Sequence, residues 1–316
     1  FQAEDGIRDR SPSRGLGDVY KRQVTTPIEH PAVLGSIAWL ESQGFSSTQV
    51  GVDGEGRIDP AALGQAMTEE TVLVCLHHAS HDLGTIQPVA EMAELTGARG
   101  IPLFVDATAS GGWLAVNVGK LGADLIALSP HRFGGPKGAG VLYRKSRVGV
   151  ENLIHGGMQE NEHRAGTENV ATIVGAGVAA KQAGAALGQA AANAAELQVS
   201  LLDGIRRTVD GVHLNGPEPG DGRLPHQLSL STEGVEGEGQ ALMLDLRGVA
   251  IAAGAACTTR SMRLPPALRA IGRDVDLAKG TTLWGIGRDT TEAEIDRAVE
   301  AFAAVTAKLR ALSPTE

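Results

Sequence analysis

The stretch TVLVCLHHASHDLGTIQPVAEMAELTGARGIPLFVDA (residues 71–107) decides the fold. It begins with TVLVCLHH (residues 71–78), an apolar and β-branched run that is typical of a buried strand. The segment PVAEMAELTGARG (residues 88–100) starts with Pro and ends with Gly, as helices do. A second apolar run, IPLFVDA (residues 101–107), predicts another strand that ends in an acid.

Two further strands are predicted, DLIALS (residues 124–129) and GAGVLYRK (residues 138–145). Strands that alternate with helices predict an α/β fold whose mostly parallel sheet is covered on both faces. Ligands of such sheets lie at the carboxyl ends of the strands. His77, Asp106 and Ser129 fall at or just past these ends, so the geometry marks a site there.

The rest of the chain predicts a long helix, over about residues 168–209, and then a second α/β unit. HQLSLS (residues 226–231) alternates as a strand does, and GEGQALMLDLRG (residues 237–248) predicts a helix that ends at Gly248. The final segment, residues 289–312, opens with the capping-box pair Thr291 and Glu294 and predicts an amphipathic helix.

These patterns divide the chain into residues 1–23, a large domain over residues 24–185 and a small C-terminal domain over residues 186–316. In the first segment, FQAEDGIRDRSPSRGLGDVYKRQ, the apolar residues follow neither the period of a helix nor that of a strand. It closely resembles the translated sequencing-adapter peptide that contaminates assembled DNA, and a natural disordered tail is the alternative. On the adapter interpretation, we expect the protein's own N-terminal part to lie upstream of this sequence.

The composition limits the possible functions of the 316-residue chain. Its net charge of −9 disfavours a nucleic-acid partner. Two cysteines indicate a reducing cytoplasm without disulfides. Because no uncharged apolar run reaches about 18 residues, we expect no membrane-spanning helix. The Ala-rich segment at residues 170–195 is interpreted as a helix with one packed face.

Two clusters carry candidate chemistry near the strand ends. Asp106 is either a turn or helix-capping acid or the partner of a ligand cation, because a carboxylate at the end of an apolar strand needs a cation or donors. Ser129, His131 and Arg132 precede the Gly-rich segment FGGPKGAG. A hydroxyl and an imidazole beside glycines suit a phosphate group, although a Gly-rich turn is weak evidence by itself.

The two cysteines and the histidine cluster give further candidates. Cys257, in the small polar segment GAACTTRS, is a candidate exposed and reactive thiol. Cys75, inside an apolar strand, is expected to be inert packing. His77 and His78 would point to opposite faces of a strand, and the spacing to His81 fits no tetrahedral zinc site, so we expect no metal.

Six motif-like segments follow one another in order along the chain: IEHPAVL (28–34), LFVDATAS (103–110), HRFGGPKGAGVLY (131–143), IHGGMQENEHRAGTENV (154–170), AAGAACTT (252–259) and GIGRDTTEAEID (285–296). In this order they resemble the cysteine desulfurases, enzymes of the class V aminotransferase type that use pyridoxal 5'-phosphate (PLP). The similarity runs from Val24 to the C-terminus. It implies a fold-type I PLP-dependent homodimer with a large and a small domain.

The resemblance assigns roles to positions that match the family's motifs. His30 matches the imidazole that stacks on the PLP ring, and Asp106 matches the acid paired with the pyridine nitrogen. Ser129 and His131 match residues beside the phosphate. Two further matches are Thr167, for a threonine that reaches the neighbouring subunit's phosphate, and Cys257, for the nucleophile that takes sulfur from L-cysteine as a persulfide.

Several positions depart from the family pattern. The Schiff-base lysine is replaced by Arg132, whose guanidinium cannot act as an amine nucleophile at neutral pH. Lys137 matches a separate lysine of the family, and we do not expect it to reach the cofactor aldehyde. The glutamine near the PLP phenolic oxygen is Ala109, and the asparagine near the cofactor is His81. The arginine that holds the substrate carboxylate is Leu283.

The departures predict a desulfurase-like protein that has lost PLP chemistry, a pseudoenzyme. It would act in the cytoplasm as a homodimer, or as a heterodimer with an active paralogue, and could still meet a sulfur-acceptor protein. Two alternatives stay open. One is an active PLP enzyme with an altered substrate, and the other is a sulfur carrier that uses Cys257.

Overall fold

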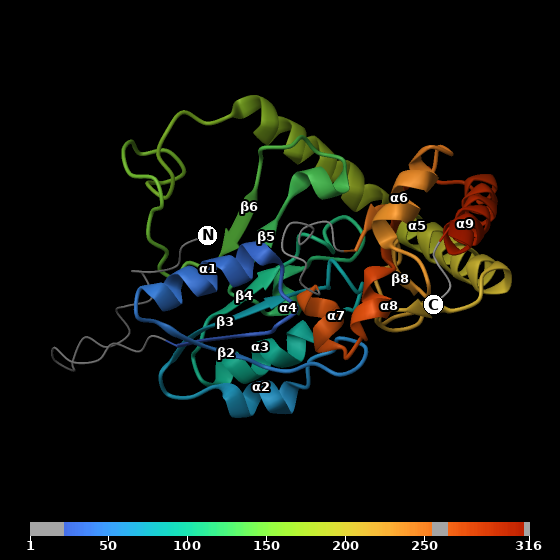
Figure 1. Cartoon of the computed structure of the whole chain (residues 1–316). Coiled ribbons are helices and arrows are strands. Elements are labelled where there is room, and N and C mark those ends of the chain that lie inside the picture. Colours follow the sequence, from blue (N-terminus) through green and yellow to red (C-terminus); the bar gives the residue numbers. More distant parts are fainter. Residues whose placement is uncertain (1–21, 255–264, 313–316) are drawn as a thin grey trace. The chain divides into compact units, whose positions relative to one another are not determined.

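A computed structural model describes residues 22–254 and 265–312 (Figure 1). The chain divides into two compact units. The first takes in the chain up to Gly51 together with residues 58–78 and 88–185, and the second takes in residues 52–57, 79–87 and all that follows Ala185. Of the expected tail, only Arg22 and Gln23 lie among the described residues, and they begin the first strand.

The first unit is built on a six-stranded sheet in the order β2-β1-β3-β4-β5-β6. Neighbouring strands from β2 to β5 are parallel, whereas β6 runs antiparallel to β5. The α/β class predicted from the sequence is therefore confirmed. The strands are β1 (Arg22–Thr25), β2 (Ser46–Gln49), β3 (Thr71–His77), β4 (Leu103–Asp106), β5 (Leu125–Leu128) and β6 (Val141–Arg144).

Helices cover both faces of this sheet, with α1 on one side and α2 and α3 on the other (Figure 1). All seven residues of β3 are buried, as expected for a strand packed on both faces. On the α1 side, Ile37 packs in one cluster with Leu73, Cys75 and Phe104. The helices are α1 (Pro31–Ser42), α2 (Pro60–Ala66), α3 (Val89–Ala98), α4 (Val118–Leu121), the 3-10 helix η1 (Pro130–Phe133) and α5 (Val170–Thr208), which continues into the second unit.

The second unit contains a four-stranded antiparallel sheet in the order β7-β8-β10-β9. Its strands are β7 (Val212–Leu214), β8 (Gln227–Thr232), β9 (Ala252–Ala253) and β10 (Thr281–Gly285). Its helices after α5 are α6 (Gly237–Asp245), α7 (Pro266–Ala270), α8 (Val275–Lys279) and α9 (Glu292–Leu312).

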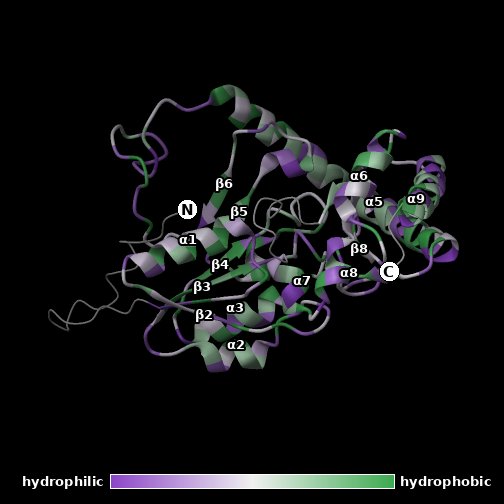
Figure 2. Cartoon of the chain, viewed as in Figure 1, coloured by the Kyte–Doolittle hydropathy of each residue, from purple (hydrophilic) through white to green (hydrophobic). Residues whose placement is uncertain are grey.

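The predicted capping box at the start of α9 is confirmed. The Glu294 N–H donates to Thr291 Oγ1 at 3.3 Å, and the Thr291 N–H donates to Glu294 Oε2 at 2.8 Å. Hydrophobic and hydrophilic residues alternate along α9 (Figure 2). Its apolar side packs inward, where Phe302 meets Trp284 of β10 edge to face at 5.4 Å between ring centroids.

Among the described residues, α5 is the one helix long and apolar enough to cross a membrane, judged by length and composition only. This is weak evidence, because packed helices of soluble proteins can meet the same criteria. Ala179 and Ala183 pack on Phe133 in the first unit. In the second unit, the buried Gln198 side chain donates to the carbonyls of Leu224 and Gln227. These contacts support the interpretation of α5 as a helix with one packed face.

Candidate functional site

Four parallel strands of the first unit bring polar residues to one edge of the sheet. Asp106 ends β4, Ser129 follows β5, His77 ends β3, and His30 comes shortly after β1. Since β1, β3, β4 and β5 are neighbours and parallel, their carboxyl ends meet at the same edge. His77, Asp106 and Ser129, which were predicted from strand ends, therefore share one edge of the sheet, and His30, which was assigned by the resemblance, follows a strand that ends at the same edge.

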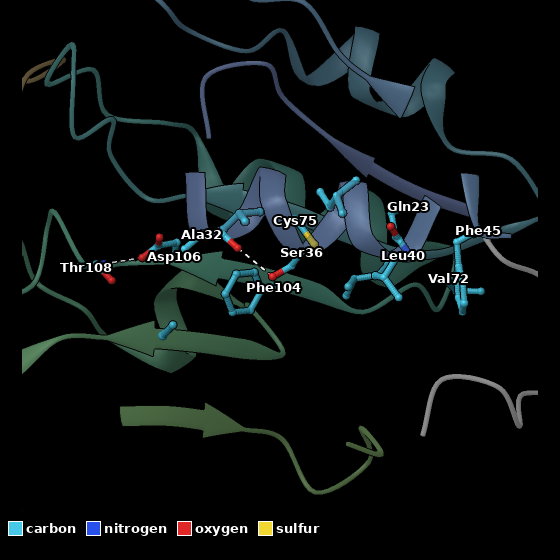
Figure 3. Close-up of a pocket in the computed structure, with 14 residues that line it drawn as sticks. Gln23, Ala32, Ser36, Leu40, Phe45, Val72, Cys75, Phe104, Asp106 and Thr108 are labelled. Carbon is cyan, nitrogen blue, oxygen red and sulfur yellow. Dashed lines mark hydrogen bonds between the residues drawn. The ribbon is translucent and has the colours of Figure 1, made fainter. Parts of the chain in front are cut away.

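Asp106 lies at one end of a cavity of about 200 Å³ between α1 and the sheet (Figure 3). Its Oδ1 accepts a hydrogen bond from the Thr108 N–H at 2.9 Å, and its side chain is half-buried. The rest of the lining is mostly apolar, so the carboxylate stands out as the charged group that could meet a ligand cation. Apolar lining residues include Val33, Ile37, Leu40, Phe45, Leu73 and Phe104.

His30 occupies the N-cap position of α1. Its Nδ1 accepts a hydrogen bond from the Ala32 N–H at 3.1 Å. In the neutral ring this bond places the lone pair on Nδ1 and the proton on Nε2. Ala32 lines the same cavity as Asp106, so the N–H that holds the imidazole and favours one tautomer belongs to a lining residue of that cavity.

The segment after β5 forms the short helix η1. Ser129 precedes it in an extended conformation, and its hydroxyl does not cap the helix. Gly134 ends η1 with φ of +89°, a value that favours glycine. His131 and Arg132 are exposed. Within residues 22–254 and 265–312, no hydrogen bond or ion pair of the Arg132 guanidinium is observed, so this cation is open to an anionic ligand.

Other predicted residues are not brought to this edge by any described contact. Thr167 is exposed in the segment between β6 and α5. His81 belongs to the second unit, where its Nε2 lies 3.5 Å from Asp82 Oδ2. Leu283 lies in β10 of that unit. Cys257 lies outside the described residues.

A buried cluster that was not predicted from the sequence lies beneath the turn that carries His30. Thr26 Oγ1 donates to Glu29 Oε1 at 2.8 Å. His77 Nδ1 lies 2.9 Å from the same oxygen, and the two side chains are 3% and 0% exposed. The spacing Thr26-x-x-Glu29 before a helix could have indicated the first contact. No local pattern predicts the second, because the partners are far apart in the sequence.

Cys75 and the histidines of the neighbouring segment do not form a metal site in the part of the chain that the structure describes. Cys75 is 4% exposed, and its thiol pKa is raised, first by burial and then by the Glu29 charge. The thiol is therefore protonated and unreactive at neutral pH. The prediction that Cys75 is an unreactive residue packed in the core is confirmed.

His78 gives a pH-dependent prediction. Burial, followed by the charge of His77, lowers its pKa to about 4 from 6.5, and its Nδ1 contacts Ser110 Oγ at 2.9 Å. Below pH 6.5 the unfolded chain takes up a proton that the native protein does not. The free energy of unfolding should therefore fall as the pH drops from 6.5 to 4. His78 should account for about 3 kcal/mol of this loss by pH 4.

Urea unfolding of the parent and of His78→Gln across this pH range tests the assignment. The variant should show a flatter dependence, because glutamine does not titrate. The matched control is His213→Gln, which removes an exposed histidine paired with Glu233 at 2.7 Å and should leave the slope nearly unchanged. Equal slopes for the parent and His78→Gln would contradict the prediction.

Comparison with known proteins shows the family to which the chain belongs. The model of the class-V aminotransferase family matches residues 20–298. The chain is 37% identical to the cysteine desulfurase IscS of Dictyoglomus turgidum over 294 residues, which are 93% of this chain and 74% of that protein. It is 39% identical to the IscS of Vibrio cholerae strain M66-2 over 312 residues, which are 97% of this chain and 76% of that protein.

A solved structure agrees with these sequence matches. The structure of a NifS-like protein superimposes with a TM-score of 0.85 at 30% identity, covering 96% of this chain and 78% of that one. The fold, the order of the motifs and the relatives agree, and the similarity extends over nearly the whole chain. The chain therefore belongs to the class-V aminotransferase family, within its cysteine desulfurases.

Proposed function

We propose that the chain is a cysteine desulfurase-like protein that no longer attaches PLP covalently and is catalytically inactive as a desulfurase. The reaction of the family removes sulfur from L-cysteine, giving alanine and an enzyme persulfide. The observation that carries the proposal is Arg132 in η1, at the position of the attachment lysine. A guanidinium stays protonated at neutral pH and has no free amine lone pair for attachment.

The residues at the sheet edge fit the non-covalent part of a PLP site. Asp106 is suited to pair with the pyridine nitrogen, and His30 to stack on the ring. Ser129 and His131 are suited to the phosphate, since a hydroxyl that does not cap η1 and an exposed imidazole can donate to it. When bound, PLP supplies an electron sink for bond cleavage in an amino-acid substrate.

Two further positions argue against desulfurase chemistry. Ala109 is 7% exposed and offers no side-chain donor to the cofactor. Leu283, in β10, offers no cation to a substrate carboxylate. We therefore do not expect L-cysteine, the substrate of the family, to be a substrate of this chain. The replacements affect cofactor attachment at Arg132, cofactor contacts at Ala109 and substrate binding at Leu283. A loss of function explains the three replacements together.

The proposed partners are a second copy or an active paralogue, and a sulfur-acceptor protein, in the cytoplasm. An apolar stripe at helical spacing on the first half of α5 supports a protein partner. Val170, Ile173, Val174 and Val178 are 64%, 48%, 59% and 51% exposed. Thr167 is exposed just before this stripe and would be available to a neighbouring subunit.

A binding experiment tests the proposal on the chain as it stands. PLP is added, absorbance is followed, and the sample is either gel-filtered or reduced with borohydride before intact mass is measured. We expect a reversible spectral change that gel filtration removes, weakened by Asp106→Asn, and no mass adduct after reduction. An adduct on the parent chain would overturn the proposal, because another lysine, such as Lys137, would then attach the cofactor.

A further inference from the structure

A buried Glu–His pair joins the turn before α1 to the end of β3. Glu29 Oε1 accepts from Thr26 Oγ1 at 2.8 Å and lies 2.9 Å from His77 Nδ1. We propose that Glu29 and His77 are positioning residues, which hold the turn Thr26–His30 so that the His30 imidazole keeps one orientation and one tautomer at the sheet edge that also carries Asp106. This inference rests on the proposed function, because that function identifies the sheet edge as a PLP site. The test of the inference does not depend on it.

Each member of the pair is adjacent to one of the two site residues. Glu29 directly precedes His30, whose Nδ1 is held by the Ala32 N–H. His77 is the register partner of Asp106 on the neighbouring strand. The pair thus connects the turn that carries the imidazole with the end of β3, the strand next to the one that carries the carboxylate. A shift of Glu29 would move His30 relative to Asp106.

Stability alone does not explain the pair. Glu29 is 3% exposed and its side chain is fully buried. Its Oε2 has no hydrogen-bond partner among the described residues. Burying such groups carries a large desolvation cost, and apolar pairs of similar volume are often equally stable or more stable. A costly polar pair directly beneath the site is better explained by the orientation that it imposes.

The test separates orientation from stability. We compare the parent with Glu29→Leu/His77→Met, which replaces the pair by apolar side chains. Histidine side-chain NMR on ¹⁵N-labelled protein reports the ring tautomer, and His30→Gln identifies the His30 signals by their loss. We expect the parent to show a single neutral tautomer with the proton on Nε2. The double variant should retain the unfolding midpoint but show a mixture of tautomers at His30.

Two further variants keep the test decisive if the double variant fails to fold. Glu29→Gln retains an acceptor for Thr26, so it should preserve the single tautomer. Thr26→Val removes the hydroxyl donor and should produce a mixture. Glu91→Leu, an exposed glutamate in the first turn of α3, is the matched control and should change nothing at His30.

The proposal is overturned if His30 keeps its single tautomer in a folded double variant, or in Thr26→Val. None of these measurements requires PLP. A PLP adduct on the reduced parent would therefore contradict the proposed function and leave the positioning result intact. A His30 tautomer that is unaffected by the variants would contradict the positioning proposal, even if PLP binds.

Discussion

Arg132→Lys is expected to convert a chain that carries no reducible PLP into one that does. After incubation with PLP and borohydride reduction, intact mass should show one phosphopyridoxyl group on most of the variant and none on the parent. The physical reason is the side-chain chemistry. Lysine supplies a primary amine that can lose its proton and attack the PLP aldehyde, whereas the delocalised guanidinium of arginine stays charged.

Local structure favours this outcome. Arg132 is exposed in η1, which starts directly after the carboxyl end of β5 and ends at Gly134 in a left-handed conformation. A lysine there has the same backbone and a similar reach. It would emerge next to Ser129 and His131, the residues proposed to hold the phosphate. The substitution therefore changes the reactive group while leaving its surroundings in place.

Two controls locate the adduct. Arg132→Met has a comparable length and no amine, so it should remain unlabelled. Arg132→Lys/Lys137→Arg should keep the adduct, because attachment at the introduced amine does not need Lys137. If neither the parent nor Arg132→Lys is labelled, the pocket itself has lost PLP and Arg132 is not the decisive change. Labelling of both would identify another lysine as functional.

The sequence predicted the parts of the fold that depend on local pattern. The apolar runs at β3, β4 and β5 were found because strands buried on both faces have continuous apolar sequences. The capping box of α9 is a contact between residues three apart, so it can be predicted from spacing. Long-range partners are different, because nothing in a local window indicates them.

Three features illustrate that limit. The antiparallel direction of β6 follows from tertiary packing and not from its own residues. Residues 79–87 join the second unit through bonds such as that from the Ile86 N–H to Gly222 O at 2.9 Å, which no period reveals. The contact between Glu29 and His77 also depends on the fold. The site edge was predicted from strand ends, but the cluster beneath it required coordinates.

The second prediction concerns Arg223, a fully buried side chain of the second unit. It is 2% exposed, and its guanidinium donates to the carbonyl oxygens of Pro217, Asn215 and Gln227. Burial lowers its pKa to about 10, while the charges of Glu218 and Glu55 act in the opposite direction. At neutral pH the group therefore remains charged, and its charge is satisfied by carbonyls in place of water.

Arg223→Met should lower the free energy of unfolding by about 4 kcal/mol, because the variant loses the charge-assisted bonds and leaves three carbonyl oxygens in a buried environment without this donor. Urea unfolding at neutral pH measures the loss. Arg223→Lys should give an intermediate value, since an ammonium on a longer flexible stem cannot reach all three carbonyls in one plane.

The matched control is Arg247→Met, which removes an exposed arginine and should stay within about 0.5 kcal/mol of the parent. A loss below about 1 kcal/mol for Arg223→Met would show that water replaces the guanidinium at these carbonyls, and that Arg223 does not hold the loop from Asn215 to Gln227 in place.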